Sequence, residues 1–353
     1  MKPRRRNSVL CSLTLLLAAT LLTSCSRLQR DSATFDADGT AHITRTIPMP
    51  QTVSPEGQHW LESLTHTKSW PQSLDEQRKR TDAWRAEGTA TARKHFPVNV
   101  EEKIIAGVRT DIITPLEMPE ANRNRVFINL HGGGFVTDSG SLIEGIPIAN
   151  LAKTKVVSVY YRLAPEYPFP AAVDDVVAVY KELLKDYKPQ SIGIFGTSAG
   201  GILTAEVAVR LKQLGEPMPA ALGLFSILAD FTRPSDSQNF FTLSGLPGDM
   251  APQYPNQTHD GPYFGKTDPK DPMLSPIFAD LHGLPPTLLV TSTRDMLLSN
   301  TALFHLALLR AGNDARLLVY EAMPHAFWYH FEFFETQDAL QQMAKFFDEK
   351  VGR

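Results

Sequence analysis

A serine between glycines follows a short apolar run near the middle of the chain. The stretch "IGIFGTSAGGILTA" covers residues 192–205 and places Ser198 between Gly196 and Gly200. The run before the serine is typical of a strand, and the residues after it favour a helix. A serine at such a turn is either a helix cap or a nucleophile held out above a sheet. We expect a Cβ at either glycine to clash in the crowded turn.

A second glycine cluster, "NLHGGGF", occupies residues 129–135 and follows a predicted strand at 126–130. Consecutive glycines leave main-chain N–H groups unshielded, and acyl transfer needs such donors where a carbonyl oxygen gains negative charge. We expect the N–H groups of Gly133, Gly134 and Ala199 to form an oxyanion hole. Gly132 is an alternative to one of them, and a flexible glycine loop is the structural alternative.

A nucleophilic serine also needs a base and an acid that orients the base. In hydrolases with the nucleophile at this kind of turn, the chain order is serine, acid, histidine. That order favours Asp295, directly after a predicted strand, and His325, beyond the last predicted strand. An acid at a helix N-terminus is the structural alternative for Asp295. The less well-placed rivals are the histidines and aspartates His282, His305, His330, Asp268, Asp271 and Asp280.

The elements around these residues alternate between short apolar runs and helical segments. Apolar strands that alternate with helices predict the α/β class, with a mostly parallel central sheet and helices on both faces. Residues 101–115 are predicted to add an antiparallel hairpin at the start of the sheet. The predicted strands are 126–130, 156–161, 191–195, 221–227, 287–292 and 316–320, and the main helices are 170–187, 199–214, 299–311 and 334–350.

Two further segments differ from this alternation. Residues 54–95 show no strand pattern, and Pro71 divides them into two predicted helices, the second starting at an N-cap-like Ser73 with Glu76 three positions on. Residues 232–286 are rich in Pro, Gly, Asn and Asp. This stretch is too long for an ordinary loop, and we expect it to shape the rim of a site.

The N-terminus has the pattern of an export signal. A basic start precedes an apolar run from Val9 to Leu22, and "LTSC" ends at Cys25. The run is too short to span a bilayer comfortably. We expect residues 1–24 to be a lipoprotein signal peptide, Cys25 to carry lipid, and residues 25–45 to be a tether. An ordinary secretory signal and twin-arginine export are the alternatives.

This pattern also predicts a location. The chain is expected to be exported and anchored to the bacterial cell envelope by lipid, in the outer membrane if the cell is Gram-negative, because Ser26 and not Asp follows the cysteine. Cys11 would leave with the signal, so the mature chain would have no disulfide. The formal net charge is −3 and the charges are mixed, which argues against nucleic acid as a partner.

Six stretches of the chain belong to one recognisable pattern: "HGGGF" (131–135), "YYRLAPEYPFPAAVDD" (160–175), "GTSAGG" (196–201), "DPMLSP" (271–276), "GLPPTLLVTSTRD" (283–295) and "MPHAF" (323–327). Together they resemble the bacterial hormone-sensitive-lipase-like branch of the α/β-hydrolase superfamily, in the subgroup with threonine before the serine. The resemblance implies an α/β-hydrolase catalytic domain over residues 96–353 and an N-terminal helical cap over residues 46–95. It also implies a serine carboxylesterase for short to medium acyl esters, with no metal or organic cofactor.

Several residues in these stretches are expected to support the oxyanion loop without acting in catalysis. Arg162 and Glu166 are expected to form a buried pair, and Asp174 to cap or brace the helix after Pro170. His131 and Gly132 complete the supporting set. Members of the branch often have Asp a few residues after the catalytic acid, where this chain has Ser299.

Other functions fit part of the pattern. The same serine, acid and histidine could hydrolyse lactones or amides. A ligand receptor built on this fold would lack the histidine, whereas this chain keeps all three residues. A surface scaffold lipoprotein would need none of them. A small ester is therefore the expected partner.

Overall fold

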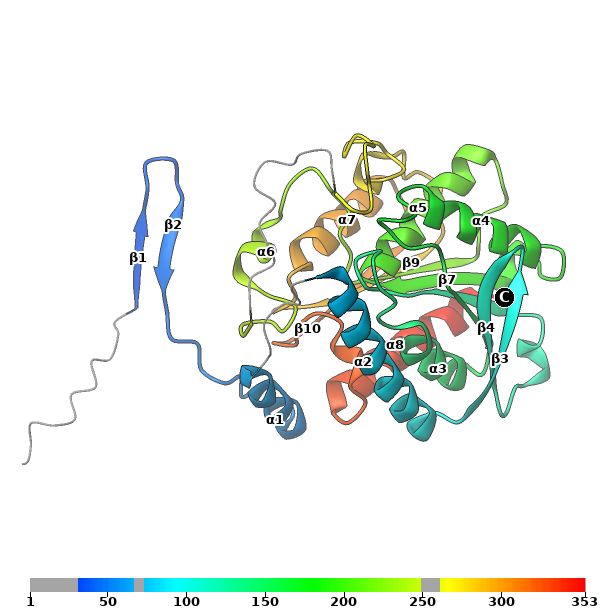
Figure 1. Cartoon of the computed structure of the whole chain (residues 1–353), viewed down its shortest axis with the longest axis horizontal. Coiled ribbons are helices and arrows are strands. Elements are labelled where there is room, and N and C mark those ends of the chain that lie inside the picture. The colour runs from blue at the N-terminus through cyan, green and yellow to red at the C-terminus, as the bar shows by residue number, and fades with distance from the viewer. Residues whose placement is uncertain (1–30, 67–72, 249–260, 353) are drawn as a thin grey trace, which may run out of the picture. The chain divides into compact units, whose positions relative to one another are not determined.

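An eight-stranded sheet forms the centre of the larger part of the chain (Figure 1). The computed structural model describes residues 31–66, 73–248 and 261–352. The chain divides into two units, Met1–Met49 and Pro50–Arg353, and the sheet lies in the second. The predicted signal peptide and Cys25 lie outside the described residues.

The strand order of the sheet is β10-β9-β8-β7-β5-β6-β4-β3. The six strands from β10 to β6 are parallel, and β4 pairs antiparallel with both β6 and β3. The mostly parallel sheet and its antiparallel hairpin are therefore confirmed. The strands are β3 (Val98–Ile105), β4 (Val108–Pro115), β5 (Val126–Leu130), β6 (Lys155–Val159), β7 (Ile192–Thr197), β8 (Ala221–Phe225), β9 (Thr287–Ser292) and β10 (Ala315–Tyr320).

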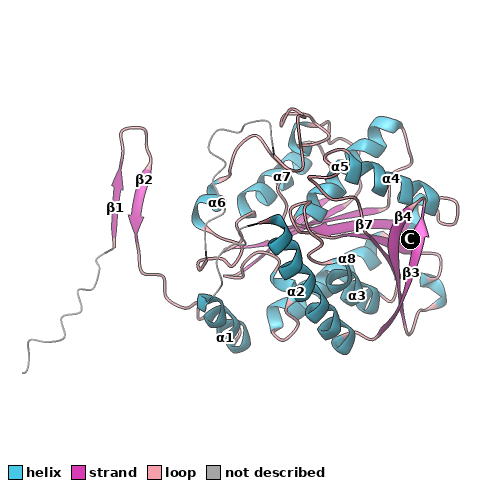
Figure 2. Cartoon of the chain, in the orientation of Figure 1, coloured by secondary structure: helices cyan, strands magenta, loops and turns pink. Residues whose placement is uncertain are grey.

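Helices cover both faces of the sheet (Figure 2). One face carries α4 (Ala171–Leu183), α5 (Ala199–Leu214) and α7 (Leu298–Arg310), and the other carries α3 (Ser141–Ala152) and α8 (Phe334–Lys350). This arrangement confirms the predicted α/β class. It explains why the central strands are largely apolar, since every residue of β5, β7 and β8 is buried.

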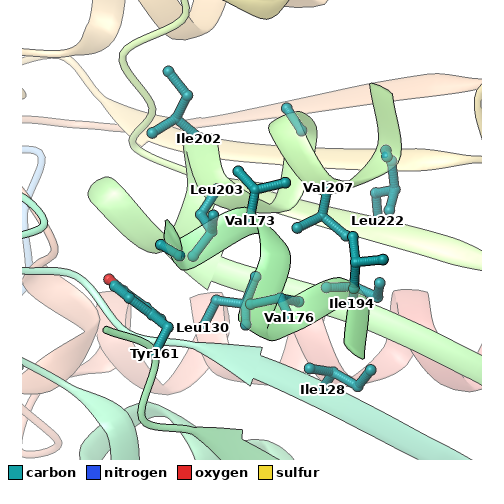
Figure 3. Close-up of a cluster of buried hydrophobic side chains, with 14 of the residues drawn as sticks. Ile128, Leu130, Tyr161, Val173, Val176, Ile194, Ile202, Leu203, Val207 and Leu222 are labelled. Carbon is teal, nitrogen blue, oxygen red and sulfur yellow. The ribbon is translucent and has the colours of Figure 1, made fainter. Parts of the chain in front are cut away.

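Alternate side chains of each strand enter different cores. Ile128, Leu130 and Ile194 belong to the core under α4 and α5, where Val173 and Leu203 meet them (Figure 3). On the opposite face, Phe127 contacts Phe347 of α8, with ring centroids 5.0 Å apart. The burial of both faces fixes the strand register, because a slip of one residue would exchange the two sets of side chains.

Two helices precede the sheet, as the sequence predicts. They are α1 (Pro55–Ser63) and α2 (Leu74–His95). The hydroxyl of Ser73 accepts a hydrogen bond from the Glu76 N–H at 3.2 Å, so the predicted N-cap is confirmed. From α1, Trp60 stacks on Phe333 with centroids 5.0 Å apart, while α2 packs against α3. Among the described residues, no helix is both long and apolar enough to cross a bilayer.

Residues 31–45, expected to form a tether, contain a hairpin in place of an irregular linker. Strands β1 (Ser32–Phe35) and β2 (Ala41–Thr44) pair antiparallel, and all their residues are exposed. The turn between them is closed by a hydrogen bond from the Asp36 N–H to the Thr40 carbonyl at 2.9 Å. Gly39 adopts a φ of 90° there, a conformation that glycine supplies without steric cost.

Helix α3 is absent from the sequence-based expectations, because Gly145 and Pro147 interrupt its helical pattern. The glycine has a packing reason. A Cβ at Gly145 would lie 2.5 Å from Cδ1 of Ile113 and 2.8 Å from the hydroxyl of Ser158. The helix can therefore approach the sheet only with glycine there. The short helix α6 (Asp236–Phe240), within the predicted rim segment, was also not predicted.

Candidate active site

The residues singled out in the sequence lie beyond the carboxyl ends of parallel strands. Strand β7 leads into Ser198, β9 is followed by Asp295 and β10 by His325, while β5 leads into the glycine loop that starts at His131. Parallel strands end at the same edge of a sheet, which is where ligands bind in open α/β sheets. The topology therefore gathers all four segments at one edge.

Ser198 occupies a sharp turn between β7 and α5. Its backbone has φ 58° and ψ −121°, which is unusual for a residue other than glycine. It stands at the N-cap position of α5, yet its side chain forms no capping hydrogen bond. The helix-cap interpretation is therefore wrong, and the hydroxyl is available for other contacts.

The flanking glycines allow this turn to form. A Cβ at Gly196 would lie 2.3 Å from the Leu130 carbonyl oxygen, and one at Gly200 only 1.8 Å from the same atom. The expected clash at both positions is confirmed. The turn consequently lies directly against the end of β5, next to the glycine loop.

Asp295 and His325 are joined by a hydrogen bond. Nδ1 of His325 lies 2.8 Å from Oδ1 of Asp295, whose side chain is 1% exposed. The same oxygen accepts the N–H of Leu297 at 2.9 Å, while Oδ2 accepts the hydroxyl of Thr291 at 2.7 Å and that of Ser226. Every side of the carboxylate is therefore engaged.

These partners keep the buried acid ionised. Burial acts to raise the pKa of the Asp295 carboxyl, but the charge of His325 and hydrogen bonds from His325 and Ser226 outweigh it, so the pKa lies below its ordinary value of 3.8. A carboxylate in this position accepts from Nδ1 of the imidazole, which fixes the tautomer and leaves Nε2 free to take a proton.

The rival histidines serve other contacts. His330 packs at a tilt against Trp60 of α1 with ring centroids 4.7 Å apart, and burial lowers the pKa of its imidazole to about 4. His282 pairs with the exposed Asp280 at 2.7 Å. His305 lies on α7, with Nε2 3.4 Å from the Ala315 carbonyl oxygen. Of the histidines after Ser198, His325 alone has a hydrogen bond to a buried carboxylate within the described residues.

The hydroxyl of Ser198 and the imidazole of His325 are not joined by a hydrogen bond among the described residues. The three predicted residues are thus brought to one edge of the sheet, and two of them are paired.

Hydrogen bonds within the glycine loop fix the direction of its carbonyl groups. The Gly132 carbonyl accepts the Ser139 N–H at 3.2 Å and lies 2.8 Å from Nδ1 of His131. In a planar trans peptide the C=O and the following N–H point in opposite directions. The N–H of Gly133 is consequently directed away from these partners.

The next peptide is held in the same way. The Gly133 carbonyl accepts the N–H groups of Val136 and Thr137, each at 3.1 Å, so the N–H of Gly134 points the other way. Within the described residues, the N–H groups of Gly133 and Gly134 donate to no protein acceptor. Gly134 is exposed and Gly133 partly so. Two main-chain donors are therefore presented to a ligand.

His131 and Gly132 connect this loop to its surroundings. The His131 ring stacks on Tyr161 with centroids 4.1 Å apart, and the Tyr161 hydroxyl donates to the His131 carbonyl at 2.6 Å. A Cβ at Gly132 would lie 3.3 Å from Cβ of Ser198. The loop therefore passes close to the serine with little room for a side chain.

The expected buried pair of Arg162 and Glu166 is wrong. Arg162 binds Asp175 instead, with Nη2 2.8 Å from Oδ1, and Asp175 also accepts the Arg162 N–H at 2.9 Å. Glu166 is half-exposed and pairs with Arg78 of α2 at 2.7 Å. Asp174 is exposed and caps nothing, so the bracing role falls to its neighbour Asp175. Adjacent carboxylates in a helix face different directions, and the sequence did not show which one faces inward.

A buried carboxyl that the sequence did not indicate lies next to the turn. Glu144 of α3 accepts hydrogen bonds from Thr197, the residue before Ser198, and from Asn129 Nδ2 at 3.0 Å. Burial raises the pKa of the Glu144 carboxyl to about 8, although both hydrogen bonds lower it. Trp328 Nε1 donates to the Thr197 hydroxyl at 3.1 Å. The carboxyl thus links the ends of β5 and β7.

Ser226 and Thr291 were also missed. Single hydroxyl residues at strand ends have no distinctive sequence pattern, and only the strand order reveals that β8 lies between β7 and β9. That order places Ser226, directly after β8, beside Asp295. The one available signal was its position immediately beyond an apolar strand.

Comparisons with known proteins agree with this geometry. Residues 127–329 match a family model described as the alpha/beta hydrolase fold. An esterase of Acinetobacter venetianus is 32% identical over 276 residues, covering 71% of this chain and 84% of the relative. An acetyl-hydrolase of Streptomyces hygroscopicus is 30% identical, covering 66% of this chain and 79% of the relative.

A solved structure shares the fold. The crystal structure of an esterase from the bacterial hormone-sensitive lipase family superposes with a TM-score of 0.73 at 28% identity, covering 84% of this chain and 99% of that one. The family match spans more than half of the chain, and the predicted resemblance is confirmed. The chain therefore belongs to the α/β-hydrolase family, within its bacterial hormone-sensitive-lipase-like branch of carboxylic ester hydrolases.

Proposed function

We propose that the chain is a serine carboxylesterase that hydrolyses short to medium acyl esters through Ser198, His325 and Asp295. The observation that carries the proposal is the 2.8 Å pairing of His325 with the buried Asp295 at the sheet edge where β7 ends in Ser198. An imidazole that is paired with a buried carboxylate, at the same sheet edge as a serine that caps no helix, has the chemistry of a base for that serine as nucleophile.

The mechanism follows from the free nitrogen of the imidazole. Because Asp295 occupies Nδ1, Nε2 of His325 takes the proton as the Ser198 oxygen attacks the ester carbonyl carbon. The tetrahedral intermediate collapses when the C–O bond to the alcohol breaks, and His325 returns the proton to the departing alkoxide. Water, deprotonated by the same nitrogen, then attacks the acyl-enzyme and releases the carboxylic acid and Ser198.

The oxyanion is assigned to three main-chain donors. Gly133 and Gly134 present N–H groups without a protein acceptor in the described residues, and Ala199 is the first residue of α5. The positive end of that helix dipole adds to the stabilisation of a developing anion. Removal of one such donor typically lowers kcat by about 100- to 1,000-fold. The position of the glycines after β5, beside the turn of Ser198, supports this assignment.

The proposed length of the acyl group is inferred from the related proteins. One is an acetyl-hydrolase and another an esterase, which favours short acyl groups for this chain. Lactones and amides are the alternative substrates for the same residues.

The test uses the full chain, with p-nitrophenyl esters from acetate to laurate and a matched p-nitroanilide. Ester turnover is expected to peak among the shorter acyl groups and to exceed anilide turnover. Ser198→Ala should lower kcat by about ten-thousandfold or more. Ser191 provides the control, because it lies at the opposite end of β7, and Ser191→Ala should behave as wild type. Near-wild-type hydrolysis by Ser198→Ala would overturn the assignment.

We also propose that the chain is exported and anchored by lipid at Cys25, with residues 1–24 as signal, 25–45 as tether, 46–95 as cap and 96–353 as catalytic domain. The support is the basic start, the apolar run and "LTSC". Cys25→Ala should move the protein from the membrane fraction to the soluble fraction and abolish incorporation of an alkynyl fatty acid. Membrane retention with no incorporation in wild type would reject the anchor.

A further inference from the structure

An arginine near the start of α2 reaches the loop that carries the oxyanion donors. Nε of Arg78 donates to the Val136 carbonyl at 2.9 Å, and Nη2 donates to the Ala164 carbonyl at 3.1 Å. Both terminal nitrogens also bind Glu166, at 2.7 Å each. A single guanidinium therefore joins α2 to two segments far away in the sequence.

Those two segments are already coupled to each other and to Gly133. The Val136 N–H donates to the Gly133 carbonyl at 3.1 Å, and the Ala164 N–H donates to the Phe135 carbonyl at 2.9 Å. The Gly133 carbonyl belongs to the same peptide plane as the Gly134 N–H. Holding the Val136 carbonyl therefore restrains the turn that sets the direction of an oxyanion donor.

The ion pair orients the guanidinium. The Arg78 side chain is 29% exposed and that of Glu166 52%, so their mutual attraction is screened by water and contributes little to stability. The two-pronged contact nevertheless fixes the plane of the guanidinium, which leaves Nε and Nη2 aimed at the carbonyl oxygens. Lysine has a single ammonium group and cannot reproduce this geometry.

A second arginine of α2 holds the other end of the loop. Nη1 of Arg85 lies 3.0 Å from Oδ2 of Asp138. The Asp138 carboxylate in turn accepts the N–H groups of Gly140 and Ser141, each at 3.1 Å, where α3 begins. The loop from His131 to Gly140 is consequently fastened to α2 at two points.

We propose that Arg78 is a positioning residue for the oxyanion hole, so that α2 takes part in transition-state stabilisation and does more than cover the site. The inference rests on the proposed function, since it assumes that Gly133 and Gly134 bind the oxyanion. Arg78 touches no reacting atom. It acts by holding the Val136 carbonyl and, through the turn, the Gly134 N–H.

The experiment compares substrate with a mimic of the intermediate. A trifluoromethyl ketone with a short alkyl chain adds the serine oxygen to its carbonyl and presents an oxyanion, so its affinity depends on the donors. Arg78→Ala in the full chain should lower kcat for p-nitrophenyl butyrate about tenfold and raise the Ki of the ketone by the same factor. KM should stay within about twofold, because ground-state binding does not use the oxyanion donors.

Matched variants separate positioning from folding. Arg78→Lys and Glu166→Gln should lower kcat and raise the ketone Ki by smaller factors. These two variants are expected to fold, so they test the proposal even if Arg78→Ala does not fold. Arg80, two residues further along α2, pairs with Glu76 on its own helix, and Arg80→Ala should match wild type in all three constants.

Two outcomes would overturn the proposal separately from the function. One is a folded Arg78→Ala with wild-type kcat and ketone Ki, and the other is a loss confined to KM or to thermal stability. If the wild-type chain neither hydrolysed esters nor bound the ketone, the proposed function itself would fall, and the role of Arg78 with it.

Discussion

Ser226 donates its hydroxyl to Oδ2 of Asp295, the carboxylate oxygen that His325 leaves free. The serine directly follows β8, the strand between the one that ends in Ser198 and the one that precedes Asp295. Strand β8 leads to no member of the proposed triad, but the residue that follows it donates a hydrogen bond to the acid, Asp295. Without this donor, burial would have a larger part in setting the pKa of Asp295.

Ser226→Ala should therefore weaken the acid. A hydrogen bond to a charged group contributes about 1.5–3 kcal/mol, and its loss should lower kcat by about 10- to 150-fold. The pKa of Asp295 lies below its ordinary value, so its charge is lost only as the pH falls through that low value. Removing a donor raises the pKa of Asp295, so its charge should be lost at a higher pH in Ser226→Ala than in wild type. Thr291→Ser keeps the second hydroxyl and serves as the control, whereas a wild-type kcat for p-nitrophenyl butyrate in Ser226→Ala would contradict this role.

The adjacent carboxylates of α4 offer a matched pair for stability. Asp175 is buried and binds Arg162, while Asp174 is exposed. Asp175→Ala should lower the free energy of unfolding by about 2 kcal/mol, a figure reduced because the Arg162 side chain is 45% exposed. Asp174→Ala should change it by less than about 0.5 kcal/mol. Urea unfolding of the two variants measures the difference, and equal effects would refute the assignment of the brace to Asp175.

The turn of Ser198 makes a steric prediction. Gly200→Ala would place Cβ 1.8 Å from the Leu130 carbonyl oxygen, a backbone atom that cannot move without shifting β5. We expect a loss of about 3 kcal/mol or more in stability, together with loss of esterase activity. Gly283→Ala is the control, because its φ is 73° but nothing lies within 4 Å of the new Cβ. It should cost about 1 kcal/mol and retain activity. A stable, active Gly200→Ala would show that the turn tolerates a side chain.

Local patterns predicted most of the fold. Strands buried on both faces, such as β5 and β7, stand out in sequence because almost every residue is apolar or small. Helix α3 did not, because Gly145 and Pro147 lower its helical propensity while packing against the sheet requires the glycine. Packing against the sheet, and not local propensity, stabilises this helix. A single sequence does not reveal such packing.

The residues of the candidate site likewise fall into those that the sequence predicts and those that it does not. Ser198, Asp295 and His325 could be predicted because each comes shortly after a predicted strand and the three occur in the expected chain order. The role of Arg78 does not follow from the sequence, because nothing in the sequence of α2 indicates that this residue meets the glycine loop. The prediction that Arg162 pairs with Glu166 failed for a similar reason. The rotation of α4 about its axis turns Asp175 toward Arg162, while Glu166 pairs with Arg78 of α2.

The buried Glu144 should give stability a distinctive dependence on pH. In the unfolded chain the carboxyl loses its proton near 4.5, whereas burial holds the folded pKa at about 8. Between these values the folded state binds one more proton, so the free energy of unfolding falls as the pH rises, by about 1.4 kcal/mol per pH unit. Glu144→Gln keeps the shape and cannot ionise. The free energy of unfolding of Glu144→Gln relative to wild type should therefore rise steadily between pH 5 and 8 and level off above, in urea titrations at each pH. A difference independent of pH would mean that Glu144 is already ionised beside Thr197, and that the link between β5 and β7 depends on a buried charge.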